Sequence, residues 1–184
     1  IQEGVASLGG YAEVFQRNVL ASGVVPQISL IMGPCAGGAV YSPAMTDFTL
    51  MVEQSSYMFV TGPNVVKTVT HEEVTSEELG GAHTHASKSG VTHFTAKNEV
   101  ECIQQVKQLL SYLPQNCEES APNYPYQTKE SEVRMPLKSV LPANPNQPYD
   151  MRDVINNTVD ADSFFEVHKK FAEKYQLPFT LLSD

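Results

Sequence analysis

The sequence predicts an α/β fold, because segments with helical periodicity alternate with short apolar segments typical of strands. Residues 2–20 carry apolar side chains at helical spacing, residues 24–32 form an apolar run, and residues 98–113 show the clearest helical stripe. The chain has 184 residues, of which 41% are hydrophobic and 18% charged. A chain of this length and composition is long enough to bury one sizeable core.

The first predicted helix ends where Gly23 can serve as its C-terminal cap. The apolar run that follows, VVPQISLIM, predicts a buried strand, and it ends in the glycine-rich stretch IMGPCAGGAV, residues 31–40. The next residues, AVYSPAM, predict a short helix that begins at this loop, with Pro43 in its first turn or kinking it. We therefore expect a strand, a glycine loop and a helix in succession.

The middle of the chain predicts two strands and two short helices. Residues 47–53 and 56–62 are rich in β-branched and aromatic side chains, which favour strands. Residues 62–70 predict a helix with Pro63 near its start, and residues 75–81 a helical turn in which Thr75 and Glu78 form a capping box.

The second half predicts one strong helix, a connector and a short terminal part. Asn98 caps the helix of residues 98–113, and Pro114 stops it; its apolar stripe is Cys102, Val106, Leu109 and Leu113. We predict a first domain over residues 1–113, a proline-rich extended connector over 114–148, and the start of a second, truncated domain over 149–184. In that last part we expect a helix from Ser163 to about Tyr175, then one strand without a partner in the chain.

Composition excludes several classes of protein. A net charge of −9 and a pI near 5.0 argue against a nucleic-acid-binding surface, and the apolar runs are shorter than the ~20 residues that a membrane span needs. The three cysteines form no CxxC pair, which argues against a disulfide framework and a thiolate metal site and favours a reducing compartment. The chain starts at Ile1 without a methionine, so we interpret it as a fragment.

The glycine loop is the candidate functional element. Backbone N–H groups between the end of a strand and the start of a helix can converge on one oxygen when no side chains intervene. We expect Gly37 and Gly38 to be the donors of an oxyanion hole, which stabilises negative charge on a carbonyl oxygen.

The residues alone leave other interpretations open. Gly33 to Gly37 has the spacing of a nucleophile elbow, with Cys35 as the nucleophile of a hydrolase and a histidine as its base. A phosphate loop is discounted because the lysine of that motif is missing, and a turn that only packs a helix on a strand stays possible. The histidines of residues 83–93 favour hydrogen bonding within a loop over a metal site, since no further ligands have suitable spacing; they are His83, His85 and His93.

Three segments together, residues 21–52, 56–82 and 89–94, resemble the carboxyltransferase subunits of propionyl-CoA carboxylase (β) and methylmalonyl-CoA decarboxylase (α). The resemblance implies a crotonase (ClpP/crotonase-like) fold of spiralling ββα units, in which Gly37 and Gly38 hold the thioester oxygen of an acyl-CoA. It also implies that neighbouring residues of the loop shape the acyl pocket: Gly33, Pro34, Ala36, Ala39 and Tyr41. No metal is expected in the chain.

The implied function is transfer of a carboxyl group from carboxybiotin to propionyl-CoA, giving methylmalonyl-CoA. A methylmalonyl-CoA decarboxylase subunit is the close alternative. The distant alternatives are a cysteine hydrolase using Cys35 and a non-catalytic fragment that retains only CoA binding or subunit contacts. The implied partners are an acyl-CoA substrate, a biotin carboxylase and biotin carrier subunit, and further copies in a ring of dimers. We expect a bacterial cytoplasmic protein, with the mitochondrial matrix as the alternative. We also expect the isolated chain to lack carboxylation activity and to be poorly soluble.

Overall fold

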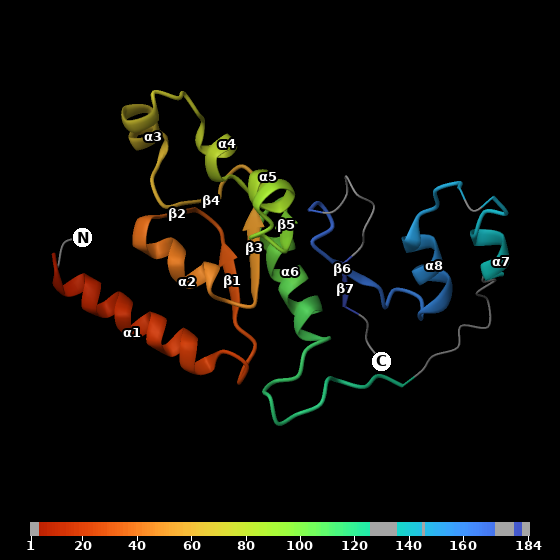
Figure 1. Ribbon diagram of the computed structural model, residues 1–184. Helices are drawn as coiled ribbons and strands as arrows, with labels where there is room; N and C mark the ends of the chain where they lie inside the picture. Colours follow the sequence, from red (N-terminus) through yellow and green to blue (C-terminus); the bar gives the residue numbers. More distant parts are fainter. Residues whose placement is uncertain (1–3, 126–135, 145, 172–178, 182–184) are drawn as a thin grey trace.

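The computed structural model describes residues 4–125, 136–144, 146–171 and 179–181 (Figure 1). A parallel sheet of three strands, in the order β1-β3-β5, lies at its centre. A separate parallel pair joins β2 to β4. The bounds of these strands are β1 Ile28–Ile31, β2 Pro34–Ala36, β3 Phe48–Val52, β4 Tyr57–Phe59 and β5 Phe94–Ala96.

Five of the predicted helices are confirmed. Thr75 caps its helix as expected, because its hydroxyl accepts the Glu78 N–H while the Glu78 carboxylate accepts the Thr75 N–H. Asn98 likewise accepts the N–H of Glu101 at 2.9 Å. The confirmed helices are α1 Ala6–Ala21, α2 Tyr41–Ala44, α3 Pro63–Thr70, α4 Ser76–Gly80 and α6 Glu99–Leu110.

The apolar stripe of α6 supplies the main core. Cys102 and Leu109 are fully buried against the central sheet, and Val106 and Leu113 pack beside them. A second cluster lies between the central sheet and the β2–β4 pair; its members are Ile31, Val40, Met51, Met58 and Ala82. Strand β3 contributes to both clusters, so it connects the sheet under α6 with the layer that carries the glycine loop.

The predicted helix from Ser163 to Tyr175 is wrong for the residues that the structure describes. Residues Phe165–Val167 form strand β6, which pairs antiparallel with β7, Phe179–Leu181. The terminal strand therefore has a partner in the chain, contrary to expectation. Ser163 and Glu166 have the spacing of a capping box, but burial of the apolar side chains favours a strand here. The Phe165 ring stacks on Phe94 with centroids 4.9 Å apart, and Val167 is 8% exposed. Residues 172–178 of the predicted helix lie outside the described residues.

Several short elements were not predicted from the sequence. Strands β2 and β5 have three residues each, too few for a periodic pattern. The proline-rich connector contains a short helix, α7, within its described part, and Asp150 caps α8 by accepting the N–H of Arg152 at 2.9 Å. The further helices are α5 Ala82–Thr84, the π-helix η2 His85–Ser89, α7 Leu137–Val140 and α8 Met151–Thr158.

Residues 163–171 pack against the core of the first part of the chain. The Tyr112 hydroxyl donates to the carbonyl of Ser163 at 2.8 Å, and the Lys170 ammonium lies 2.8 Å from the Glu53 carboxylate. The division into domains at 113/114 and 148/149 stays a prediction. Both contacts join the predicted first domain, residues 1–113, to the predicted last part, residues 149–184.

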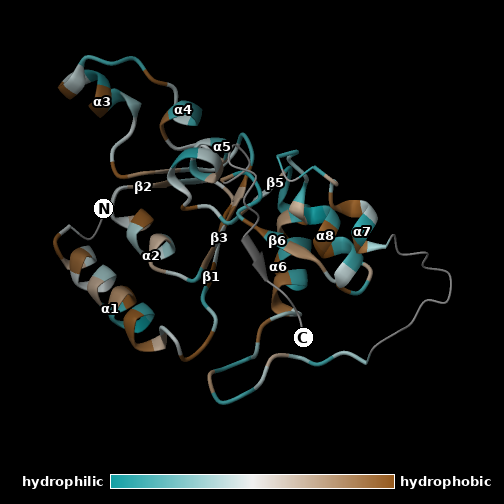
Figure 2. Cartoon of the chain, turned by 45° about the vertical axis from the view of Figure 1, so that its right-hand side comes forward, coloured by the Kyte–Doolittle hydropathy of each residue, from teal (hydrophilic) through white to brown (hydrophobic). Residues whose placement is uncertain are grey.

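Helix α1 lies along one side of the molecule and buries none of its residues (Figure 1). Several of its residues are hydrophobic and are coloured brown in Figure 2. Leu8, Val19 and Leu20 are 67%, 62% and 70% exposed. Among the described helices, none combines the length and hydropathy that crossing a membrane would need.

Candidate active site

The glycine loop forms where β2 passes into a helix. Ala36 is extended, Gly37 has a φ of +63°, and residues Gly37–Val40 form a 3-10 helix, η1, that continues into α2. A positive φ is strained for residues with a Cβ, so glycine is the residue that permits this turn. The first N–H groups of a helix have no carbonyl partner within it. The loop therefore places backbone N–H groups that have no acceptor within their own helix at the start of η1.

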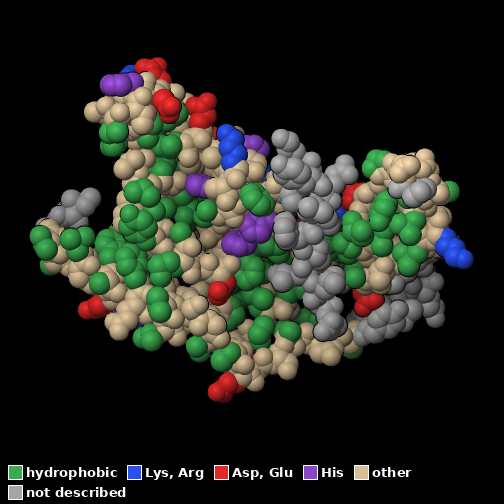
Figure 3. Space-filling view, viewed as in Figure 1, with side chains coloured by type: hydrophobic (Ala, Val, Ile, Leu, Met, Phe, Trp, Pro, Cys, Tyr) green, Lys and Arg blue, Asp and Glu red, His purple; other side chains and the backbone are tan. Residues whose placement is uncertain are grey.

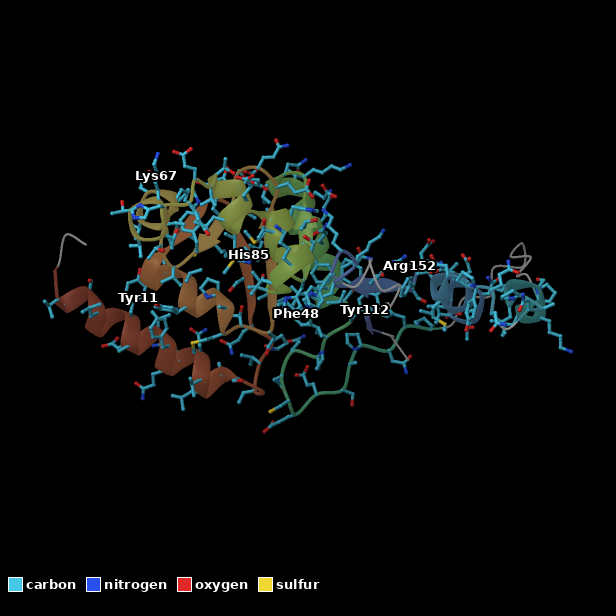
Figure 4. The ribbon with its side chains drawn as sticks, turned by 45° about the horizontal axis from the view of Figure 1, so that its top comes forward. Tyr11, Phe48, Lys67, His85, Tyr112 and Arg152 are labelled. Atoms are coloured by element: carbon cyan, nitrogen blue, oxygen red, sulfur yellow. The ribbon has the colours of Figure 1, made fainter. Side chains whose placement is uncertain are left out.

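Two groups from other parts of the chain lie near Gly37 and Gly38. A Cβ added at Gly38 would lie 3.7 Å from the Tyr11 ring of α1, and one at Gly37 would lie 4.0 Å from the carbonyl oxygen of Val60 after β4. Figure 4 labels Tyr11 on α1, beside α2. The sequence analysis missed both Tyr11 and Val60, because no motif connects residues so far apart in the chain.

Tyr11 begins a row of aromatic rings beside the loop. Its ring stacks on Phe15, with centroids 6.0 Å apart, and Phe15 meets Tyr41 edge-to-face at 6.2 Å. Tyr41, predicted to shape the acyl pocket, is 46% exposed. The rings make an apolar surface next to the loop donors.

The other residues predicted for the pocket lie in the same contiguous segment. Pro34 and Ala36 are exposed on β2, while Gly33 and Ala39 are half-buried. A Cβ added at Gly33 would meet nothing within 4 Å. The structure brings these residues together, and their contact with an acyl group stays a prediction.

Cys35 lacks the surroundings of a nucleophile. Its Sγ lies 3.3 Å from the carbonyl oxygen of Ala39, and burial raises the pKa of the thiol, which disfavours the reactive thiolate. Both ring nitrogens of His85, in η2, are already in contact with other groups: Nε2 lies 2.7 Å from the carbonyl oxygen of Met58, and Nδ1 lies 2.7 Å from Ser89 Oγ. The geometry therefore speaks against the cysteine-hydrolase alternative.

The histidines of residues 83–93 occupy separate places. His83 is exposed, whereas His93 Nδ1 accepts the N–H of Thr49 at 3.0 Å and its ring lies on His168, with centroids 4.3 Å apart. Burial, and next the charge of His168, lowers the pKa of His93 to about 4. Within the part of the chain that is described, no three His, Cys, Asp or Glu side chains gather as a metal site.

A cavity of about 450 Å³ lies elsewhere, between β5, α6, α8 and β6. Its wall includes Phe165, His168 and the Arg152 guanidinium, which binds the Glu166 carboxylate through two nitrogens at 2.8 to 3.1 Å. None of its lining residues belongs to the glycine loop. The volume suits a small molecule, but the backbone donors that carbonyl chemistry would use lie at the loop, so the loop stays the candidate active site.

Comparison with known proteins identifies the family of the chain. The family model described as carboxyl transferase domain matches residues 1–179. The propionyl-CoA carboxylase beta chain of Roseobacter denitrificans is 57% identical over 173 residues, which cover 94% of this chain and 34% of that relative. The methylmalonyl-CoA decarboxylase subunit alpha of Veillonella parvula is 55% identical over 172 residues, with the same coverage of 94% and 34%. The chain thus spans about a third of the length of these relatives.

Solved structures give the same answer for the fold. Transcarboxylase 12S, a hexamer solved with hydrolysed methylmalonyl-coenzyme A bound, superimposes with a TM-score of 0.85 at 46% identity, covering 94% of this chain and 34% of that one. The beta subunit of geranyl-CoA carboxylase from P. aeruginosa matches with a TM-score of 0.52 at 26% identity, covering 91% and 34%. The predicted α/β crotonase fold and the resemblance to carboxyltransferase subunits are confirmed. The chain belongs to the carboxyl transferase domain family.

Proposed function

We propose that the chain forms the acyl-CoA-binding part of a biotin-dependent carboxyltransferase that acts on propionyl-CoA and yields methylmalonyl-CoA. The observation that carries the proposal is the turn at Gly37 and Gly38, whose backbone donors lie at the junction of β2 and η1. The family membership supports it, as do a relative named propionyl-CoA carboxylase and a neighbour solved with methylmalonyl-coenzyme A bound.

The loop acts by stabilising charge. The N–H groups of Gly37 and Gly38 donate to the thioester oxygen while a base elsewhere in the enzyme takes up the α-proton. The enolate that results uses the electron pair of its α-carbon to form the new bond to the carboxyl carbon. Removal of one such donor typically costs about 3 kcal/mol of transition-state stabilisation. Cys35, the one titratable side chain among residues 33–40, has a raised pKa, so the amides and not a side chain carry this step.

Biotin, carried on a partner subunit, supplies the carboxyl group. In the described part of this chain, Gly37 and Gly38 form the one glycine pair that opens a helix after a strand, and we assign that pair to the thioester. We propose that the residues that hold biotin belong to a part of the enzyme outside this segment. Carboxylation by the isolated chain is not expected.

The remaining partners follow from the same proposal. We propose a biotin carboxylase and carrier subunit, and assembly of further copies into a ring of dimers, which the exposed apolar side chains of α1 support. The location proposed is the bacterial cytoplasm, with the mitochondrial matrix as the alternative. A methylmalonyl-CoA decarboxylase subunit is the second candidate, supported by the relative from Veillonella parvula. It would use the same loop with the transfer reversed.

Calorimetric titration of the chain with propionyl-CoA tests the proposal. Gly38→Val places a side chain beside the donors, with its Cβ in van der Waals contact with the Tyr11 ring at 3.7 Å, and should abolish binding. Gly9→Val is the matched control, since Gly9 is exposed on α1 with nothing within 4 Å of an added Cβ. Cys35→Ala should bind like the wild type. Equal binding by the Gly38→Val and Gly9→Val variants would contradict the proposal.

A further inference from the structure

We propose that His85 is a positioning residue for the glycine loop: its ring holds strand β4 in place, and β2 with the loop is built on β4. The inference rests on the proposed function, because it concerns the same donors. It starts from one contact, in which His85 Nε2 lies 2.7 Å from the carbonyl oxygen of Met58 in β4. A carbonyl can only accept, so Nε2 carries the hydrogen and donates it.

The contact completes an edge of the two-stranded sheet. Strand β4 pairs with β2 along one edge and with no other strand of the described residues. Met58 is 2% exposed, so its carbonyl group is removed from water and needs a donor from the protein. His85 provides that donor, and His85 Nδ1 is in turn held by Ser89 Oγ at 2.7 Å. The ring is thus fixed at both nitrogens.

The path from Met58 to the loop is short. Met58 lies opposite Cys35 in the parallel register, and Phe59 lies opposite Ala36, the residue before Gly37. The carbonyl of Val60, next after β4, lies 4.0 Å from the position of a Cβ at Gly37. A displacement of β4 therefore moves the segment that orients the amides of Gly37 and Gly38.

The neighbours of His85 are fitted to β4 equally closely. A Cβ on Gly80 would lie 2.1 Å from the Met58 carbonyl oxygen, and Gly81 forms an isolated bridge with Tyr57. His85 itself begins η2, a π-helix, a rare geometry found frequently at functional sites. Figure 4 labels His85 between the upper helices and the strands. Residues 80–85 thus pack closely against β4, and His85 supplies a hydrogen bond to it.

Four variants of the 184-residue chain test the inference. His85→Leu removes the donor, whereas His85→Gln keeps an N–H that can reach the Met58 carbonyl. His83→Leu is the matched control, because His83 lies in the same segment with its side chain exposed. Leu109→Val is the control for lost stability, because Leu109 is fully buried in the other core cluster.

Two readouts separate positioning from a general loss of stability. Amide hydrogen exchange should show protection in residues 35–40 and 57–60 falling about tenfold or more in His85→Leu, with protection of α6 unchanged. Propionyl-CoA binding should weaken by about the same factor. His85→Gln should restore both the protection of these residues and the affinity for propionyl-CoA. Neither control variant should change either quantity by more than its effect on overall stability explains.

The outcomes distinguish this inference from the proposed function. If His85→Leu leaves protection of residues 35–40 unchanged, or if His85→Gln fails to restore it, the inference is overturned. If the wild-type chain binds no propionyl-CoA but His85→Leu selectively loses that protection, the inference stands and the proposed ligand is wrong. Uniform loss of protection over α6 as well would mean that His85 only stabilises the fold, and would also overturn the inference.

Discussion

Adding a side chain at Gly80 is a direct test of the close packing between α4 and β4. A Cβ at this position would lie 2.1 Å from the carbonyl oxygen and 2.9 Å from the carbonyl carbon of Met58, and 2.9 Å from Cδ1 of Phe59. Contacts below 3.0 Å are essentially never observed for real Cβ atoms, so α4 and β4 must separate by at least 0.9 Å, the difference between 3.0 and 2.1 Å. The obstructing atoms are mostly backbone, which cannot rotate away. Gly80→Ala should therefore destabilise the fold by about 2 kcal/mol.

Thermal unfolding followed by circular dichroism measures this effect. For a domain of this size, a loss of about 2 kcal/mol lowers Tm by roughly 4–8 °C. Gly9→Ala is the control, since it changes another helical glycine with nothing within 4 Å of the added Cβ, and should keep or raise Tm. A Tm for Gly80→Ala equal to that of the wild type would refute the close approach of α4 and β4.

Three further predictions concern other parts of the molecule. Because burial lowers the pKa of His93 from 6.5 to about 4, the unfolded chain binds a proton that the folded chain does not. The free energy of unfolding is therefore highest above pH 6.5, where His93 is neutral in both states. It falls as the pH drops toward 4, by about 2 kcal/mol after allowance for partial exposure of the ring. His93→Asn should reduce the difference in urea midpoint between pH 7 and 4.5, and an unchanged difference would contradict the burial of that ring. Glu166→Gln removes the charge that the Arg152 guanidinium binds, and should speed amide exchange in α8 several-fold while leaving α6 unchanged. Iodoacetamide should modify exposed Cys117 well before Cys35, whose pKa burial raises, and mass spectrometry showing the reverse order would revive the hydrolase alternative.

The sequence predicted the elements whose signals are local. The Thr75–Glu78 capping box and the Asn98 cap are read from neighbouring residues, and both are present in the structure. The stripe of α6 also predicted its buried face correctly, because a three-turn helix shows enough repeats of its period.

The prediction failed where contacts distant in sequence decide the structure. Phe165 belongs to a strand because it stacks on Phe94 and lies beside Tyr112, and no local pattern carries that information. At the proposed active site, the glycine turn could be predicted from neighbouring residues, while the placement of Tyr11 and the contact of His85 with Met58 depend on how separate elements pack. Figure 3 shows histidine side chains, coloured purple, at several separate places on one face of the molecule.

The amide signals of the glycine loop test the central claim most directly. We would record nitrogen-15 spectra of the labelled chain while adding propionyl-CoA, and follow Gly37 and Gly38 together with residues lining the 450 Å³ cavity, such as Phe165. If the loop amides donate to the thioester oxygen, the signals of Gly37 and Gly38 should shift downfield and saturate, and Phe165 should not move. Saturable shifts confined to the cavity, with the glycine signals unchanged, would contradict the assignment of the active site to the loop.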